Sequence, residues 1–430
     1  MLKCRQCSQQ IEEDAFGPGK ICPYCGKESA PVDIKEFHVF LGNSAPISPW
    51  ELIRDTEEEY YLDIDYLEAW PCIEFSIGDI SNPPYSNIHC VTYRYTSADG
   101  VKQCEDEVIE KIKSVPSDVT VYFWINTSSA NEYLRLLFYS SHFLRFKEVY
   151  LLLHSREDYD FEWDFSGLLN RKRRVTRDEL RAMTAEFREV QARGSEYRIG
   201  GYGDVVHLSY KELTDVVSAA VTKEYRNMAT IYCDIREKMI EKTGYLLPFD
   251  VVEDVLWRLL VENRIKCEGI PSWWGSTHYK MFCECKFSLG KRGMLKCTYD
   301  EVADAVCDAL EYGATLPLYD VVDDDAVLEF EHLNEKVYGK NAIIERLEII
   351  GADLYYTKKV FLLCDILRKC RGDRYGIGIF TSCAKGDLSE RYWVSVDLNN
   401  KKIRGIRVTK AEPFLFPVTD YQRHLIEERS

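Results

Sequence analysis

The sequence predicts a multidomain α/β protein, in which a zinc ribbon is followed by a parallel Rossmann-like sheet, a helical winged-helix-like region and an α+β C-terminal domain. Three observations predict this organisation. Two Cys-x-x-Cys pairs lie close together at the N-terminus. Strand-like and helix-like segments then alternate, which is typical of a parallel sheet. Further on, three helical segments are closed by a hairpin, and strand-like segments end the chain.

The length of 430 residues is too great for one core. We expect a zinc ribbon at 1–30, a Rossmann-like domain at 31–157, a helical region at 158–298 and the C-terminal domain at 299–430. Hydrophobic residues make up 46% of the chain, which excludes a disordered protein. No apolar run is long enough to cross a membrane, and the N-terminus lacks the apolar segment of a signal peptide. We therefore expect a cytoplasmic protein with reduced cysteines.

The N-terminal cysteines Cys4, Cys7, Cys22 and Cys25 predict a structural zinc site. Two residues between paired thiols allow both sulfurs of one turn to bind the same ion, and two such turns complete a tetrahedral shell. Gly26 follows the second pair, where a positive φ would direct backbone N–H groups at the thiolates. A closed shell leaves no position for a substrate, so we expect the metal to stabilise the fold. The alternative is a pair of disulfides or four unrelated cysteines.

The first strand of the expected sheet is Phe37–Leu41, an apolar run of strand length. The turn Gly42-Asn43-Ser44 closes it. Ser48 then begins a capping box, with proline at the first helical position, and this predicts a helix. Strand, tight turn and helix together form the repeating unit of a parallel sheet.

The second such unit begins with the strand Val119–Ile125. Its nearly continuous apolar and β-branched residues are expected of a strand buried on both faces. Ser129 and Glu132 form another capping box. We expect a helix from Asn131 to Phe146 and a further strand from Val149 to Leu153.

The central part of the chain predicts mainly helices. Thr176 and Glu179 form a capping box, and Arg198–Gly203 is expected to be a loop. The helices expected next are Ser209–Val221, Glu224–Glu241 and Pro248–Asn263, followed by hairpin strands at Arg264–Cys267 and Met281–Lys286. Three helices closed by a hairpin are the outline of a winged helix-turn-helix.

The last part predicts an α+β domain with an antiparallel meander. The expected helices are Ala326–Tyr338 and Lys358–Arg371, and the expected strands are Tyr375–Phe380, Arg391–Leu398 and Ile403–Val408. Asn399-Asn400-Lys401 is typical of a hairpin turn, because asparagine tolerates positive φ.

Two turns supply candidate ligand-binding residues. The turn after the first strand lies where a doubly wound sheet usually binds its ligand, outside the carboxyl ends of its strands. The turn after Val119–Ile125 would emerge at the same edge, beside a helix N-terminus that favours an anion. The candidates are Gly42, Asn43, Ser44, Asn126, Ser128 and Ser129. The alternative is that they are turn and cap residues, because serine and asparagine serve such positions in any protein.

A strand followed by Gly-Asn-Ser also resembles the nucleophile block of the GDSL-type esterases, in which Ser44 would attack an ester. Asn43 replaces that family's aspartate. Asp420 and His424 are one residue too far apart for its Asp-x-x-His motif. Because a serine needs a positioned base to become nucleophilic, the sequence predicts no catalytic residue.

A second resemblance extends from Phe37 to Cys285. The segment is similar to a bacterial family of domains of unknown function. That family opens with a strand and a Gly-Asp-Ser turn, continues through a strand ending in tryptophan and a helix with a Glu-Gln-Leu motif, and closes with a winged-helix-like partner domain. The matching residues are Gly42-Asn43-Ser44, Trp124 and Glu132-Tyr133-Leu134, with departures at Asn43 and Tyr133. The resemblance implies this fold but no activity.

The expected hairpin and a basic run supply candidate partner-binding residues. Trp273 and Trp274 lie near the hairpin tip, where adjacent tryptophans can stack on bases or anchor a protein, or can pack back onto the helices. Arg171, Arg173 and Arg174 are compatible with phosphate contacts. The net charge of −16 nevertheless argues against a protein that coats nucleic acid.

Cys267, His278, Cys283 and Cys285 fall close together around the same hairpin. A second zinc site is conceivable, but Cys-x-Cys with a distant cysteine is not a common closed-site spacing. Core thiols are preferred, because free cysteine is among the most buried residue types.

These features predict an interaction or regulatory protein rather than an enzyme. The ribbon and the hairpin would contact nucleic acid or a protein partner. The alternative is an enzyme or a nucleotide-binding or phosphate-binding protein that uses the crevice at Gly42–Ser44 and Asn126–Ser129.

Overall fold

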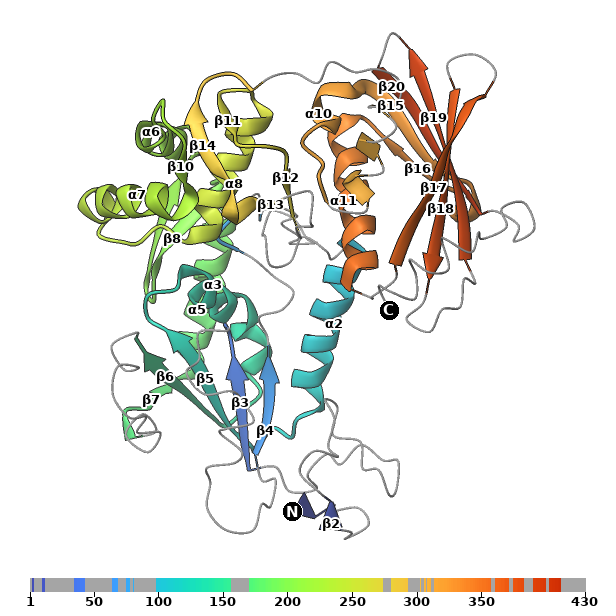
Figure 1. Ribbon diagram of the computed structural model, residues 1–430. Helices are drawn as coiled ribbons and strands as arrows, with labels where there is room; N and C mark the ends of the chain where they lie inside the picture. Colours follow the sequence, from blue (N-terminus) through green and yellow to red (C-terminus); the bar gives the residue numbers. More distant parts are fainter. Residues whose placement is uncertain are drawn as a thin grey trace. The chain divides into compact units, whose positions relative to one another are not determined.

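The structure is a computed structural model of the chain (Figure 1). It describes residues 2–3, 10–11, 35–42, 64–68, 75–77, 80, 98–155, 170–273, 280–292, 302, 305–306, 308–310, 313–356, 360–370, 374–382, 390–399 and 402–410. The chain divides into two compact units, one of residues 1–87, 98–210 and 239–248, the other of residues 88–97, 211–238 and 249–430. Both contain helices and strands, so the expected mixed α/β class is confirmed. The four expected domain boundaries stay a prediction.

A five-stranded sheet organises the first unit. Its strands, in spatial order, are β4 (Ile64–Glu68), β3 (Glu36–Phe40), β5 (Thr120–Asn126), β6 (Glu148–His154) and β7 (Arg173–Val175). The first four run parallel, and only β7 pairs antiparallel with its neighbour (Figure 1). The parallel arrangement expected for this part of the chain is therefore confirmed.

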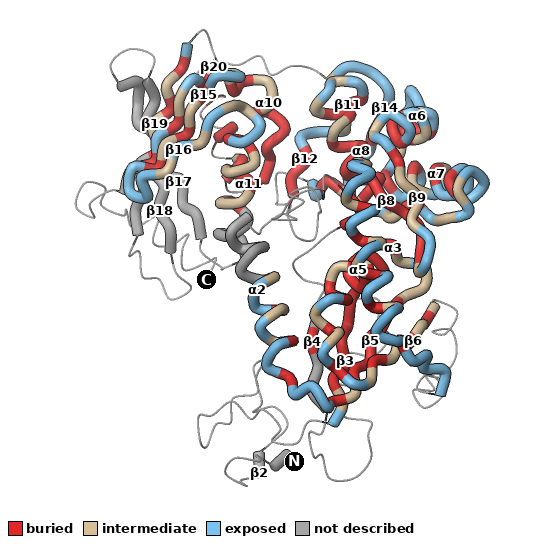
Figure 2. The backbone as a smooth tube through the Cα atoms, turned by 180° about the vertical axis from the view of Figure 1, so that it is seen from behind, coloured by how far each residue is buried: buried red, intermediate tan, exposed pale blue. Residues whose placement is uncertain are grey.

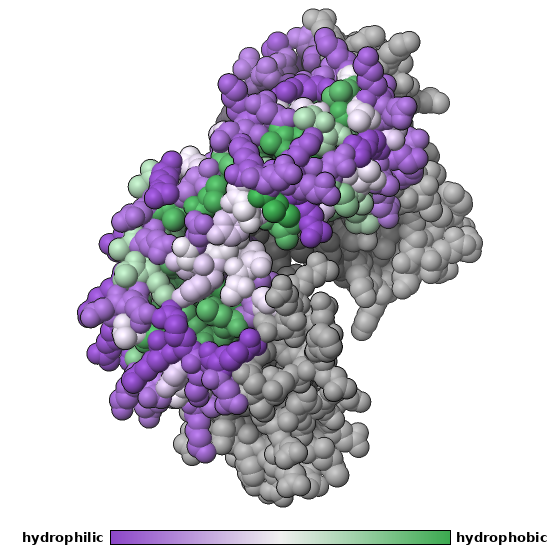
Figure 3. Space-filling model, turned by 90° about the vertical axis from the view of Figure 1, so that its left-hand side faces the viewer, coloured by the Kyte–Doolittle hydropathy of each residue, from purple (hydrophilic) through white to green (hydrophobic). Residues whose placement is uncertain are grey.

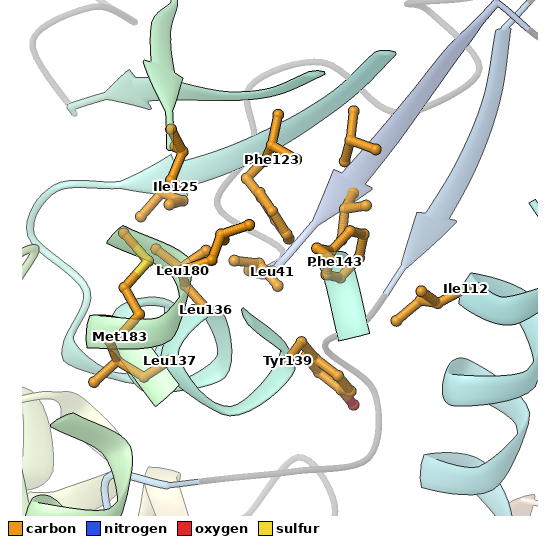
Figure 4. Packing of buried hydrophobic residues seen from close by; sticks show 14 of the residues in the cluster. Leu41, Ile112, Phe123, Ile125, Leu136, Leu137, Tyr139, Phe143, Leu180 and Met183 are labelled. Carbon is orange, nitrogen blue, oxygen red and sulfur yellow. The ribbon is translucent and has the colours of Figure 1, made fainter. Parts of the chain in front are cut away.

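One face of this sheet packs on helices and forms the core of the unit. Alternate residues of a strand point to opposite faces, so Leu41, Phe123 and Ile125 face the same side. The covering helices are α2 (Ala98–Ser114), α3 (Ala130–Tyr139) and α5 (Arg177–Ala192). Leu136 of α3 and Leu180 of α5 lie against the strands (Figure 4). Each fully buried side chain of this size contributes roughly 1.5–3 kcal/mol through the hydrophobic effect.

The opposite face of the sheet is buried as well. His38, Phe40 and Trp124 have 0%, 2% and 1% of their surface exposed. Burial on both faces explains the nearly continuous apolar run in β5, because neither set of alternating residues meets solvent.

The segment Arg198–Gly203, expected to be a loop, is instead part of a β-hairpin. Strands β8 (Tyr197–Gly201) and β9 (Asp204–Leu208) pair antiparallel through a two-residue turn. Gly203 has φ of +83°, which a tight hairpin turn requires and glycine adopts without steric cost. The glycines that suggested a loop are therefore hairpin residues.

The next segment contains the three expected helices and the first expected hairpin strand. The second expected strand, Met281–Lys286, is wrong: Phe282–Glu284 is a 3-10 helix, and the strand that pairs with Ile265–Cys267 is Lys286–Leu289. The elements of the segment are α6 (Tyr210–Ala220), β10 (Arg226–Asn227), α7 (Met228–Thr243), α8 (Phe249–Val261), β11 (Ile265–Cys267) and β14 (Lys286–Leu289). The three strands form an antiparallel sheet in the order β10-β14-β11. Figure 2 shows that α8 is buried along most of its length. In the sequence, the short strands β12 (Pro271–Ser272) and β13 (Lys280–Met281) come between β11 and β14, and they pair with each other in a separate sheet.

A six-stranded sheet with one long helix completes the second unit. Its spatial order is β16 (Glu335–Tyr338), β15 (Val322–Phe330), β20 (Lys402–Lys410), β19 (Glu390–Asn399), β18 (Arg374–Ser382) and β17 (Val360–Cys370). The last four strands in the chain form the expected antiparallel meander. Helices α10 (Leu318–Val321) and α11 (Lys340–Tyr356) join this sheet through a shared hydrophobic core (Figure 1).

Two helices expected in this part are wrong. Ala326–Tyr338 is the end of β15, a 3-10 helix at Glu331–Leu333 and β16, and Lys358–Arg371 contains β17. Ala326, Leu328 and Phe330 are buried at every second residue, which is the period of a strand. The run in β17 is apolar at several consecutive positions, and periodicity alone does not distinguish a strand from a buried helix there.

The N-terminal cysteines Cys4, Cys7, Cys22 and Cys25 lie outside the described residues, so the zinc ribbon stays a prediction. In the part of the chain that the structure describes, no helix is both long and apolar enough to cross a membrane.

Candidate functional site

The carboxyl ends of β3 and β5 lie side by side in the sheet. In the sheet, β4 lies on one side of β3 and β5 lies on the other side. The direction in which successive strands are added therefore reverses between β3 and β5. Such a switch point is where open α/β sheets usually bind ligands. Gly42 and the Asn126–Ser129 loop lie here, as the sequence predicted. Asn43 and Ser44 lie outside the described residues.

Glu132, in the first turn of α3, joins the two strand ends. Its Oε2 atom accepts a hydrogen bond from the backbone N–H of Asn126 at 2.7 Å, and its own N–H donates to the Ser129 hydroxyl at 3.2 Å. A Cβ atom on Gly42 would lie 2.1 Å from Oε1 of Glu132. The carboxylate is 3% exposed and therefore occupies the space beside Gly42. The sequence identified Glu132 only as a helix cap and as part of a motif.

Arg135 and Tyr139 continue the same face of α3, because residues three, four and seven apart lie above one another on a helix. Arg135 is 4% exposed and donates from Nη1 to the carbonyl oxygen of Leu41 at 2.7 Å. Burial raises the pKa of Tyr139, whose hydroxyl has no hydrogen-bond partner among the described residues. A carboxylate, a guanidinium and a phenol thus lie along one face of α3, and the first two contact the end of β3. Sequence reasoning missed Arg135 and Tyr139.

The backbone N–H groups of the Asn126–Ser129 loop all donate hydrogen bonds within the protein. The N–H of Thr127 donates to the His154 carbonyl at 2.8 Å. The N–H of Ser128 donates to Oδ1 of Asn126 at 2.9 Å, and that of Ser129 to the Asn126 carbonyl at 3.1 Å. Together with the Glu132 contact, these bonds engage all four backbone N–H groups of the loop. An external anion would also meet the charge of Glu132 at this helix N-terminus, so the contacts match turn and cap roles.

The β8–β9 hairpin packs on the same loop. The N–H of Tyr202 donates to the Thr127 carbonyl at 3.0 Å. A Cβ atom on Gly201 would lie 2.1 Å from that carbonyl oxygen. Glycine at position 201 therefore permits the close approach of the hairpin to the loop.

A chain of polar groups crosses the second face of the sheet. The Trp124 Nε1–H donates to Nδ1 of His38 at 3.0 Å, which leaves the His38 proton on Nε2, 3.3 Å from Oε2 of Glu36. Burial lowers the pKa of His38, although the Glu36 carboxylate acts in the opposite direction. The hydrogen bond with His38 lowers the pKa of Glu36. The imidazole is therefore neutral and holds two strands in register. His38 stacks on Tyr122, and the Lys172 ammonium lies over that ring.

The three candidate arginines of the basic run are exposed, and Arg173 and Arg174 lie beside acidic side chains. Arg173 forms an ion pair with Glu179 at 2.5 Å, and Arg174 lies 3.9 Å from Glu148. Arg171, exposed like the other two, lies just before β7.

Trp273 is 3% exposed and packs against Trp257 and Phe282 at ring-centroid distances of 4.6 Å and 5.1 Å. The packing role that the sequence left open is the one that Trp273 takes here. Trp274 lies outside the described residues.

The described residues contain no group of three or more histidine, cysteine or acidic side chains arranged to hold a metal. Cys267, Cys283 and Cys285 are free thiols near one another in the chain. Burial raises the pKa of Cys267 to about 11 and that of Cys285 to about 12, so both stay neutral at physiological pH. Cys285, which is buried and neutral, fits the preferred role as a core thiol, whereas Cys267 and Cys283 are partly exposed. His278 lies outside the described residues.

Fold and site together define a multidomain α/β protein. No protein-family model and no curated protein matches the chain. A designed protein with a curved β-sheet is 14% identical, with 30% of this chain and 94% of that chain covered and a TM-score of 0.22. An NTF-2 like protein of unknown function from Burkholderia xenovorans is 16% identical, covering 31% and 95%, with a TM-score of 0.22. A protein with a cystatin-like fold from Methylobium petroleophilum is 16% identical, covering 27% and 76%, with a TM-score of 0.23. At these TM-scores no functional conclusion follows.

Proposed function

We propose that this is a zinc-containing interaction protein, that its helical region is a winged-helix module, and that the module binds another protein rather than nucleic acid. The order helix, strand, helix, helix and hairpin over Tyr210–Leu289 supports the winged helix. The antiparallel order β10-β14-β11 supports it too, because it places the first short strand beside the hairpin. The proposed zinc ribbon with Cys4, Cys7, Cys22 and Cys25 would be a second contact module.

The burial of α8 is the main reason to propose a protein partner rather than nucleic acid. The DNA-reading helix of a helix-turn-helix protein lies in the major groove and presents several side chains to base edges. Helix α8 occupies the corresponding third position, but nine of its 13 residues are buried. The buried set includes Glu253 and Asp254, at 2% and 1% exposure. The side chains of a buried helix cannot reach the base edges in a DNA groove, and acidic side chains are repelled by the phosphates.

The basic stretches of the chain support the same choice, because carboxylates lie beside them. Lys280 and Lys286 both lie 3.6 Å from Glu268, and Arg404 lies 3.3 Å from Asp323. Binding by charge alone releases counterions from phosphates and needs cations that are available to them. Each of these cations would first have to exchange an internal carboxylate for a phosphate.

The hairpin supplies a candidate contact surface. Ile270, which precedes β12, and Met281, which belongs to β13, are 36% and 37% exposed. Methionine adapts to partners of different shape, and Lys280 and Glu268 supply a polar rim. On the face of the molecule in Figure 3, hydrophobic side chains form separate small patches within a hydrophilic surface. A small apolar contact with a polar rim is typical of a transient protein interface.

The test combines a nucleic-acid assay with site-specific cross-linking on the full chain. Binding of labelled duplex DNA and single-stranded RNA is measured by fluorescence anisotropy between about 50 mM and about 200 mM salt. We expect no salt-sensitive binding of either nucleic acid. A photo-reactive residue at Met281 is expected to capture a discrete protein, and Met281→Glu is expected to weaken binding of that protein once purified. The control places the photo-reactive residue at position 237, in place of the exposed Glu237 of α7, and this variant should capture nothing. Tight, salt-sensitive nucleic-acid binding that is lost on replacing Arg171, Arg173 and Arg174 by alanine would contradict the proposal.

The alternative is a small-ligand site at the switch point, formed by Gly42, Asn43, Ser44, Asn126, Ser128 and Ser129. The reversal of strand order between β3 and β5 favours it, as does the buried Tyr139 hydroxyl beside Arg135. Native mass spectrometry of the purified chain tests it. A bound small molecule that is absent from an Arg135→Leu variant would support the alternative, and an unliganded mass for both would count against it.

A further inference from the structure

Glu348 of α11 connects helix α11 with the hairpin region. The wing loop is defined here as residues 268–273 and 280–285, the described parts of the connection between β11 and β14. The Glu348 Oε1 atom accepts hydrogen bonds from Nε1–H of Trp273 at 3.3 Å and from the hydroxyl of Thr315 at 2.5 Å. Glu348 is 7% exposed and Trp273 3%, so this contact is sheltered from solvent. Hydrogen bonds to a sheltered carboxylate are among the stronger ones in proteins.

Further contacts hold the same parts of the second unit together. The Trp257 ring of α8 lies 4.6 Å from Trp273 and 6.2 Å from Tyr319, measured between ring centroids. Arg292 donates to both carboxylate oxygens of Asp320, at 2.5 Å and 2.7 Å. The wing loop is therefore packed on α8 by an aromatic cluster that also includes Tyr319 of α10. The hydrogen bond from Trp273 to Glu348 joins the loop to α11.

A second glutamate lies one turn earlier on the same face of α11. Burial, and then the charge of Glu348, raises the pKa of Glu345 to about 7. Among the described residues, the groups that donate hydrogen bonds to Glu348 from other elements are Trp273 and Thr315, and both are neutral. The nearby cations have other acidic partners. Arg346 is 2.9 Å from Glu335 of β16, and Lys340 is 3.0 Å from Asp324 of β15.

We infer that Trp273, Thr315 and Glu348 form a proton-controlled latch, which holds the wing loop against α11 while Glu345 is protonated and loosens when Glu345 ionises. A second negative charge three residues away in a partly buried site opposes the charge of Glu348. The sign follows from linkage. A carboxyl whose folded pKa is raised contributes stability that is present at low pH and lost as the pH rises towards about 7.

The latch itself is a property of the fold, and only its consequence rests on the proposed function. Loosening would release the loop that carries Ile270 and Met281, the proposed contact surface. The latch would then couple partner binding to pH near neutrality.

Hydrogen exchange of the full chain, followed by mass spectrometry, tests the latch directly. Exchange rates of wing-loop amides are compared with intrinsic rates between about pH 6 and about pH 8. In the wild type, protection is expected to fall about five- to tenfold as the pH rises. Glu345→Gln should keep the low-pH protection throughout, because it cannot ionise. Glu237→Gln, an exposed carboxyl on α7, is the control and should behave as wild type.

A second variant separates the latch from a general loss of packing. Trp273→Phe keeps an aromatic ring in the cluster but removes the N–H donor, so it should lower protection at about pH 6 and abolish the pH response. A wild-type loop with equal protection at both pH values would overturn the latch, as would a Glu345→Gln variant with the wild-type response. Because no partner is present in this measurement, failure of the latch is distinct from failure of the proposed function.

Discussion

The contact between Gly42 and Glu132 shows how a missing side chain fixes the end of a strand. The Glu132 carboxylate fills the position that a Cβ atom would take, and it also accepts the N–H of Asn126 on the neighbouring strand. Glycine 42 has no positive φ, so its role here is to leave space rather than to permit an unusual backbone conformation.

Gly42→Ala tests this role. The added methyl group would lie 2.1 Å from Oε1 of Glu132, so we expect the free energy of unfolding to fall by about 1–3 kcal/mol. Urea denaturation followed by circular dichroism measures it. In a Glu132→Ala background the clash is absent, and the same substitution should cost less than about 0.5 kcal/mol. Equal costs in both backgrounds would show that Glu132 does not fill this space.

His38 predicts a pH dependence of stability. Burial lowers the pKa of this imidazole below its ordinary value of 6.5, so the unfolded chain binds the proton more readily than the folded one. We therefore expect stability to fall as the pH drops below about 6.5. The lowered pKa of Glu36 adds a further loss only below about 4.5, because that carboxyl must first be protonated.

Urea denaturation at pH values above and below 6.5 measures the His38 contribution. A His38→Gln variant should be less stable at neutral pH but lose less stability on acidification than the wild type. An imidazole NMR signal of His38 that titrates with an ordinary pKa would contradict the prediction.

At the scale of elements, the N-terminus of α5 is a capping box. The Thr176 hydroxyl accepts from the Glu179 N–H at 3.2 Å, and the Thr176 N–H donates to the Glu179 carboxylate at 2.7 Å. Thr176→Ala is expected to lower the free energy of unfolding by about 1 kcal/mol, as measured by urea denaturation. Arg181→Ala, an exposed substitution in the same helix, is the control and should change it by less than about 0.5 kcal/mol. An equal effect of both would mean that the cap adds nothing.

Local chemistry explains which elements the sequence predicted. Caps such as Thr176 and Ser129 and the buried strand β5 are specified by residues within a few positions of one another. Strand β4 was missed because Ile64–Glu68 belongs to an acid-rich stretch, and its strand character depends on pairing with β3. Strand β17 was assigned to a helix, since its apolar run fits either period.

The same distinction applies to the candidate site. Gly42 and Asn126 were predicted because strand ends can be located in a sequence. Arg135 was not, because its partner is the Leu41 carbonyl, 94 positions away. The burial of Trp273 likewise depends on Glu348, which is 75 residues further along the chain. Contacts between residues so far apart in the sequence cannot be predicted from a local sequence pattern.

At the scale of the molecule, opposite charges that are distant in sequence are paired. The acid-rich strand β15 lies beside the basic strand β20, where Arg407 contacts Glu329 at 3.1 Å. A basic stretch in the sequence is therefore no guide to a basic surface. The net charge of −16 remains a property that opposes nucleic-acid binding by the whole molecule.

The proposed zinc ribbon predicts the metal content of the purified chain. Four thiolates in a closed shell bind one ion, so elemental analysis should find about one zinc per chain. Cys22→Ala should lose most of it, whereas Cys233→Ala, which removes an exposed thiol on α7, should not. Substantially less than one zinc in the wild type would refute the closed shell.

The pairing of β15 with β20 has a consequence for how the protein is made. The first strand of the six-stranded sheet lies between β16 and β20, and β20 is the last of the six in chain order. During translation, the backbone groups on one edge of β15 have no β20 partner until Lys402–Lys410 has left the ribosome. Ribosome-bound chains that stop short of this segment should therefore be the ones that need a chaperone most.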